Sequence, residues 1–307
     1  MDNNVLSQPQ EHYDDEIDLR ELFGVLWAGK IKIVAITAVF AIASVIYALS
    51  VPNQYKATAL LSPAQSSGGG LSGALGQLGG LASLAGVSIG GSESSEAQVA
   101  QEIMKSWSFI EGFIDSNNLA VEISAAKGWD EETNRLIIDN DTYDVENKNW
   151  VLEDGPPSSW KLFKAFSSRV SVSKDNKSGL VSVSIEHYSP QVAKQWLDLY
   201  VAAINDHMQK RKMAKVTRNI EYLEAQIKKT NIAQMQEVFY TIIEEQIKSK
   251  MLAEASPDYA FGAVSPSMVP EEKSQPKRSQ ICILGTLLGG MLSVLLVLIM
   301  HYAKKTD

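Results

Sequence analysis

The sequence predicts an α+β membrane protein, in which two transmembrane helices flank an α/β base domain that carries a long, coiled-coil-like helical projection. Residues 33–51 and 279–300 carry no formal charge. Helices of 19 and 22 residues rise about 28 and 33 Å, which is enough to cross the hydrocarbon of a bilayer. Between them, residues 52–278 suffice for one domain, and residues 191–256 within this loop contain neither Gly nor Pro.

The composition excludes several classes of function. A net charge of −8 argues against nucleic-acid binding, because phosphate recognition needs clustered Lys and Arg. The single cysteine, Cys282, lies inside the second apolar segment, so an intramolecular disulfide or a cysteine metal site is not expected. The four histidines are scattered, and no nucleophile or Walker motif is present. We therefore expect no enzymatic activity, no catalytic or metal-binding residues and no cofactor.

Residues 1–32 are predicted to form a cytoplasmic tail with an amphipathic helix in the membrane interface. Leu19, Leu22, Phe23, Leu26 and Trp27 have the spacing of one helical face, after an acidic start. An ordinary juxtamembrane helix without a partner is the alternative. About 30 residues precede the apolar run, more than a usual n-region, which favours an uncleaved transmembrane helix at 33–51 over a signal peptide.

Two spans place both termini on the same side of the membrane. The basic residues that flank the spans are nearly balanced between the two sides and do not fix the orientation. We expect both termini, including the tail 301–307, in the cytoplasm and the long loop outside it.

The predicted base domain, residues 52–190, begins with a strand at 54–61, where β-branched and aromatic residues are frequent. A Gly-rich loop at 68–91 follows and holds ten of the twenty glycines of the chain. No lysine follows these glycines, which argues against a phosphate-binding loop. A flexible loop is the favoured interpretation, and a small-residue helix that packs on a neighbouring subunit is the alternative.

The rest of the base domain is predicted to alternate between helices and strands. We expect a helix over 94–115, a polar acidic loop over 117–157, a helix over 158–168, and a β-hairpin made of strands 169–173 and 180–187. The acidic loop lacks the Gly and Glu of a calcium-binding loop. The expected buried stripe of the first helix is Val99, Ile103, Trp107, Ile110 and Ile114.

The helical projection is predicted at residues 191–256, with Ser189 as its N-cap and Pro190 at its first position. Met213, Val216, Ile220, Leu223 and Ile227 follow the 3-4 spacing of a coiled-coil seam. After residues 228–231 the stripe shifts to Met235, Phe239, Ile242 and Gln246. A continuous rod of 66 residues would be about 99 Å long. The 22 residues that follow span about 68 Å at most as polyproline II, so a helical hairpin that turns near Asn231 is favoured over a rod.

A Pro-rich return segment at 257–278 is expected to lead back to the membrane, and residues 259–261 are candidates for a further strand. The second transmembrane helix, 279–300, contains Gly285 and Gly289 four residues apart, a spacing that lets helices approach closely in lipid.

Several of these segments resemble the Wzz-type polysaccharide chain-length determinants, also called polysaccharide co-polymerases. The resemblance lies in residues 15–22, in the Leu26-Trp27 pair with Lys30, and in Pro52, Tyr55, Lys56 and Ala57 after the first span. Further resemblance lies in Ser189-Pro190 with Ala193 and Trp196, and in Pro270 and Pro276 before the glycine-containing span. Family members that are fused to a tyrosine kinase carry a nucleotide site after the second span, and we expect none after the second span of this chain.

The resemblance implies a bacterial inner-membrane protein with a periplasmic base domain, assembled as a ring of identical subunits. Such rings regulate the modal length of lipopolysaccharide O-antigen made by the O-antigen polymerase. Our hypothesis is that the ring binds the polymerase and the growing lipid-linked glycan weakly and repeatedly, and biases termination without forming or breaking bonds.

The hypothesis assigns roles to seven residues. Subunit packing would depend on the seam residues Ile220, Leu223 and Ile227. Placement of the second span against the first span or the polymerase would depend on Pro270, Pro276, Gly285 and Gly289. The alternatives are a co-polymerase for capsule or exopolysaccharide, and a two-span membrane sensor or tether. A sensor needs an output domain, for which we expect no room in residues 301–307.

Overall fold

The computed structural model describes residues 19–64 and 92–306. The chain forms two compact units, residues 1–51 with 276–307 and residues 52–275. The Gly-rich loop predicted at 68–91 and most of the N-terminal tail lie outside the described residues.

In its described residues, 19–51 and 276–306, the first unit consists of three helices, α1 (Leu19–Ala28), α2 (Lys30–Ser50) and α11 (Arg278–Thr306). Helices α2 and α11 pack along each other. Both are long and apolar enough to cross a membrane. Helix α2 begins three residues before the predicted span 33–51. Helix α11 continues past residue 300, where the second predicted span ends. Each helix is therefore longer than the uncharged segment at one of its ends.

The second unit is built on an antiparallel sheet with the strand order β6-β7-β1-β8, in which β9 also pairs with β1. The strands are β1 (Gln54–Pro63), β6 (Val170–Lys174), β7 (Val181–His187), β8 (Phe261–Ser265) and β9 (Lys273–Gln275). The predicted hairpin is therefore confirmed as β6 and β7. The further strand is β8, which pairs with β1 but begins at Phe261, so residues 259 and 260 of the predicted strand lie outside it.

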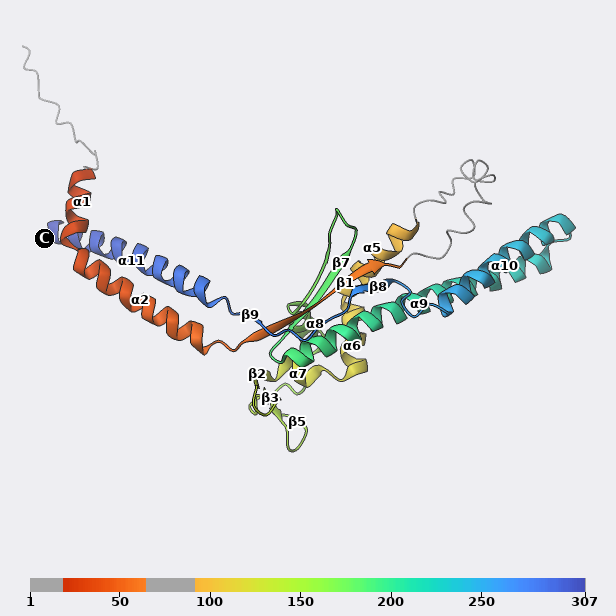
Figure 1. Cartoon of the computed structure of the whole chain (residues 1–307), viewed down its shortest axis with the longest axis horizontal. Helices are drawn as coiled ribbons and strands as arrows, with labels where there is room; N and C mark the ends of the chain where they lie inside the picture. The colour runs from red at the N-terminus through yellow and green to blue at the C-terminus, as the bar shows by residue number, and fades with distance from the viewer. Residues whose placement is uncertain (1–18, 65–91, 307) are drawn as a thin grey trace, which may run out of the picture. The chain divides into compact units, whose positions relative to one another are not determined.

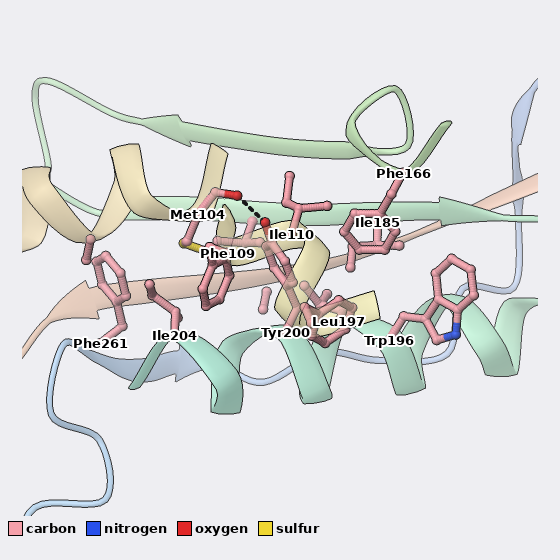
Figure 2. Close-up of a cluster of buried hydrophobic side chains, with 14 of the residues drawn as sticks. Met104, Phe109, Ile110, Phe166, Ile185, Trp196, Leu197, Tyr200, Ile204 and Phe261 are labelled. Carbon is pink, nitrogen blue, oxygen red and sulfur yellow. Dashed lines mark hydrogen bonds between the residues drawn. The ribbon is translucent and has the colours of Figure 1, made fainter. Parts of the chain in front are cut away.

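The core lies between this sheet and the first half of α9 (Pro190–Lys229), as Figure 2 shows. Alternate residues of β7, Val181, Val183 and Ile185, are fully buried, as expected for strand residues that share one face. Trp196, Leu197, Tyr200 and Ile204 are the buried residues of α9 that face them (Figure 2). The N-cap at Ser189, whose hydroxyl accepts a hydrogen bond from the Val192 amide at 3.4 Å, and Pro190 at the first position are confirmed.

The predicted single helix over 94–115 is wrong, because the chain forms two helices, α5 (Ser92–Lys105) and α6 (Trp107–Asn117). Ser106 has extended backbone angles, and its hydroxyl accepts a hydrogen bond from the Phe109 amide at 3.4 Å. This N-cap starts a new helix and changes the buried face. Ile110 is buried, whereas the side chain of Trp107 is 45% exposed.

Residues 117–157 contain more structure than the predicted loop. They form α7 (Ala120–Ser124) and two small hairpins, β2 (Ala126–Asp130) with β3 (Arg135–Ile138) and β4 (Tyr143–Asp144) with β5 (Asn149–Trp150). Asp139 and Asp144 accept hydrogen bonds from backbone amides two residues later, so these carboxylates stabilise turns. The helix α8 (Ser159–Ser167) follows, with Ser158 as its N-cap.

The helical projection is a hairpin and not a rod. Helix α9 ends at Lys229 and α10 (Ala233–Glu254) runs back along it (Figure 1). The Gln209 amide donates hydrogen bonds to the carbonyl oxygens of Ala253 and Ser256, at 2.8 and 3.1 Å, which fixes the antiparallel arrangement. The turn at residues 230–232 agrees with the turn predicted near Asn231.

Candidate functional site

In the described part of the chain no three His, Cys, Asp or Glu side chains come together as metal ligands. The candidate sites are therefore surfaces, and the base-domain core positions one of them. The hydroxyl of Tyr200 on α9 donates a hydrogen bond to the Met104 carbonyl of α5 (Figure 2). The centre of its ring lies 5.0 Å from the ring centre of Phe113 on α6 and 5.6 Å from that of Phe166 on α8. Because the inner faces of α6 and α8 pack on α9 through these rings, the positions of their outer faces are fixed as well.

The outer faces of α6 and α8 carry two exposed tryptophans, which we call the aromatic surface. Trp107 and Trp160 are 45% and 54% exposed. The Trp107 indole donates to the Ser159 hydroxyl at 3.1 Å, and that hydroxyl donates to a Glu111 carboxylate oxygen. The Lys164 ammonium lies 5.4 Å from the centre of the Trp160 ring. The aromatic surface therefore combines flat apolar rings with a hydroxyl, a carboxylate and an ammonium group.

A shallow hollow of about 430 Å³ on α5 lies next in sequence to Trp107. Val99 and Ile103 line it, with Gln98, Glu102 and Ser106 as its polar residues. Val99 is 38% exposed, so this part of the predicted buried stripe is wrong as well. Ile103, in contrast, is half-buried and packs against the core, as the stripe predicts.

The predicted seam residues Ile220, Leu223 and Ile227 are half-buried on α9. Helices α9 and α10 of one chain pack on each other, and the half-burial of the seam residues is consistent with a place in this contact. The stripe predicted for α10 is right for Phe239 and Gln246, which are half-buried, and wrong for Met235 and Ile242, which are exposed.

Helix α10 instead has an exposed apolar row, which we call the outer stripe: Met235, Val238 and Ile242. These side chains are 46%, 56% and 40% exposed. Their spacing of three and four residues places them on one helical face. Met235 and Ile242 belong to the stripe that the sequence predicts, whereas Val238 does not.

The predicted glycine pair lies at the contact between α2 and α11. A Cβ atom built at Gly285 would lie 2.5 Å from the Ser44 Cβ atom, and one at Gly289 would lie 2.4 Å from the Phe40 Cβ atom. One turn further on, the Thr37 and Ser293 hydroxyl oxygens are 3.3 Å apart. The two glycines thus permit the close approach of the helices.

The two predicted prolines lie on either side of β9, and both are half-buried. Pro270 precedes the strand, whereas Pro276 separates it from α11. A residue that the sequence did not single out holds the start of the return segment. The buried Asn205 amide accepts hydrogen bonds from the Ala260 and Phe261 amides and donates one to the Phe261 carbonyl, all at 2.9 Å.

A buried polar cluster at the start of α9 was also not predicted. Burial, together with the positive charge of Arg169, lowers the pKa of His187 to about 3. His187 Nδ1 accepts a hydrogen bond from the Ser189 amide at 3.1 Å, and its ring centre is 4.7 Å from that of Trp196. The Trp196 indole donates to Glu122 at 3.2 Å, and burial raises the pKa of that carboxyl. These residues are too far apart in the chain for a sequence pattern to reveal the cluster. The neutral imidazole packs as part of the buried interior.

Comparisons with known proteins show a resemblance to one family. Residues 15–116 match the family model described as Wzz, chain length determinant protein, whereas no curated protein matches the chain. Three solved structures are similar to it. A full-length bacterial polysaccharide co-polymerase is 15% identical, over 94% of this chain and 99% of that one, with a TM-score of 0.41.

The other two structures cover less of this chain. A fragment of WzzB, a polysaccharide co-polymerase from Salmonella Typhimurium, is 12% identical over 72% of this chain and 99% of that one, with a TM-score of 0.30. A mutant of the Shigella flexneri lipopolysaccharide O-antigen chain-length regulator WzzBSF is 10% identical over 72% of this chain and 100% of that one, with a TM-score of 0.25. The TM-scores of these three structures are low. The predicted resemblance to the Wzz family is therefore confirmed by the match of residues 15–116 to the family model.

Proposed function

From the match of residues 15–116 to the Wzz chain length determinant model, we propose that this protein regulates polysaccharide chain length as a non-enzymatic co-polymerase. Its polymer is lipopolysaccharide O-antigen, and it acts as a homo-oligomeric ring together with the O-antigen polymerase. The two apolar helices flank the second unit, residues 52–275, which we call the loop domain. These helices support placement of the protein in the bacterial inner membrane. In this proposal both termini lie in the cytoplasm and the loop domain lies in the periplasm.

Self-association is supported by the outer stripe. Three apolar side chains on one face of α10 are at least 40% exposed, and a row of this kind is a candidate contact between proteins. Since α9 and α10 pack on each other and Ile220, Leu223 and Ile227 are half-buried on α9, we assign these residues an indirect role, which is to hold the helix that presents the stripe. Gly285 and Gly289 place the second span against the first.

Contact with the growing lipid-linked glycan is assigned to the aromatic surface. A sugar ring has an apolar C–H face and a rim of hydroxyls, and it therefore suits a site where an indole ring lies beside hydrogen-bonding groups. Trp107 and Trp160 supply the rings, and Glu111 and Lys164 supply the polar groups. Exposed rings without a deep pocket fit weak and repeated binding, in which the protein changes the probability of termination.

The decisive experiment is deletion of the gene followed by gel analysis of surface glycan. We expect polymer to be made still, but without a preferred length, because a regulator that makes no bonds is not needed for polymerisation. Complementation with the wild-type chain should restore the modal length. Loss of all polymer on deletion would contradict a purely regulatory role. A change confined to capsule or exopolysaccharide would contradict the assignment to O-antigen.

Two sets of variants test the surfaces. Trp107→Ala with Trp160→Ala should broaden the length distribution, whereas Val151→Ala, a change at another exposed side chain of the loop domain, should leave it unchanged. Val238→Gln with Ile242→Gln should lower the oligomer size in detergent. The control Glu237→Gln lies on α10 outside the outer stripe and should not. Equal effects of test and control variants would refute the assignment of that surface.

A further inference from the structure

The first unit contains a cavity that the proposed function does not use. It has a volume of about 170 Å³ and is lined by residues from all three helices, at the place where α1 meets the start of α2 and the last turns of α11. A volume of this size exceeds roughly tenfold the minimum that a single water molecule needs. Two of its lining residues, Lys32 and His301, are basic, and Val297 and Met300 give it an apolar wall.

Gly29 is required for the shape of this cavity. A Cβ atom at Gly29 would lie 2.5 Å from the Val297 Cγ1 atom. Val25 and Val297 are 8% and 6% exposed, so the joint between α1 and α2 is packed firmly against α11. Gly24, in contrast, has nothing within 4 Å of a built Cβ atom. The two glycines of this segment thus form a natural test and control pair.

The two lysines at the start of α2 differ in their surroundings. The Lys30 ammonium lies 4.6 Å from the centre of the Trp27 ring, and Lys30 does not line the cavity. Lys32 does line it, and so does His301 of α11. Both basic residues lie at the ends of the apolar segments, which is the depth of the lipid headgroups when such helices span a bilayer.

We propose that this cavity binds the headgroup phosphate of an anionic phospholipid. Lys32 and His301 contact the phosphate, and the glycerol and first acyl carbons lie along Val297 and Met300. Basic pockets between membrane helices suit such headgroups, because a cation attracts the phosphate while the neighbouring apolar wall accepts the chain. A zwitterionic headgroup is disfavoured, since its quaternary ammonium would lie near the Lys32 ammonium. The inference rests on α2 and α11 spanning a membrane, and it is independent of chain-length regulation.

The test uses the full-length protein in a neutral detergent, with native mass spectrometry as the readout. Phosphatidylglycerol and phosphatidylcholine with identical acyl chains are added separately and in competition. We expect the wild type to retain phosphatidylglycerol preferentially. Lys32→Gln should lower that preference about fivefold, the effect of one cation near an anionic lipid, whereas Lys30→Gln should lower it much less. Gly29→Ala should reduce binding, and Gly24→Ala should not.

Three outcomes would overturn the proposal: equal retention of the two lipids by the wild type, equal losses in the two lysine variants, or displacement of the lipid by millimolar inorganic phosphate. The last result would identify a site for a free anion. Because Lys32 is exposed, its replacement leaves the fold intact and keeps the test informative even if Gly29→Ala fails to fold. A gene deletion without effect on glycan length would refute the proposed function and leave this lipid site standing.

Discussion

Replacement of Gly289 by alanine should separate the two apolar helices. The added Cβ atom would lie 2.4 Å from the Cβ and 2.8 Å from the Cγ atom of Phe40. The Phe40 Cβ atom is fixed by the backbone of α2, so a change of side-chain rotamer does not relieve the contact. The adjacent residue provides a matched control, because a Cβ atom at Gly290 has its nearest neighbour, the Thr37 hydroxyl oxygen, at 4.0 Å.

The size of the effect follows from these distances. Carbon atoms in favourable contact lie about 3.5–4.0 Å apart, so the helices must move apart locally by about 1.1–1.6 Å. Overpacking of this kind costs about 1–3 kcal/mol. The shift also lengthens the contact between the Thr37 and Ser293 hydroxyls, which are 3.3 Å apart in the native pair. These two positions therefore report on the separation of the helices.

Disulfide formation measures this separation in membranes. In a background that carries Cys282→Ala, which removes the native thiol, Thr37→Cys and Ser293→Cys are introduced and oxidised. Unreacted thiols are then counted with a maleimide-linked polymer. We expect efficient closure in the parent and with Gly290→Ala, and much less with Gly289→Ala, because disulfide geometry tolerates little displacement. Closure that is equally efficient with Gly289→Ala would refute the reasoning, and a dimeric product would show that the contact joins two chains.

Three further predictions concern the loop domain and are measured as unfolding of the full chain in detergent. Because the pKa of His187 is lowered to about 3, the unfolded chain takes up a proton below about pH 6.5 that the folded chain does not, so the free energy of unfolding should fall by about 2 kcal/mol from pH 6.5 to pH 5. His187→Gln should remove this slope, and an unchanged slope would contradict the assignment. Asn205→Ala leaves two backbone amides of the return segment unpaired and should lower the free energy of unfolding by about 2–4 kcal/mol. A decrease below about 1 kcal/mol would contradict a role of these hydrogen bonds, which we call the Asn205 clamp, in holding the return segment. Tyr200→Phe removes the hydrogen bond to the Met104 carbonyl and should cost about 1–2 kcal/mol, whereas Tyr222→Phe, at a side chain that is 64% exposed, should be neutral.

The features that the sequence predicts correctly depend on local chemistry. The β6–β7 hairpin follows from alternating valines on either side of turn residues, and the start of α9 follows from Ser189 and Pro190. The helical hairpin follows from a length argument. In each case the deciding information lies within a few residues of the element, or in a simple count of residues.

The errors arise where tertiary packing decides between local alternatives. The hydrophobic period runs unbroken through Ser106, so a single helix fits the pattern, although the Ser106 hydroxyl is also a good N-cap. In α10 the apolar residues outnumber the positions that face α9, and the half-buried Gln246 occupies one of those positions. Periodicity therefore identifies the helix but not its inner face. The Asn205 clamp joins residues 55 and 56 positions apart, and no local pattern reveals such a contact.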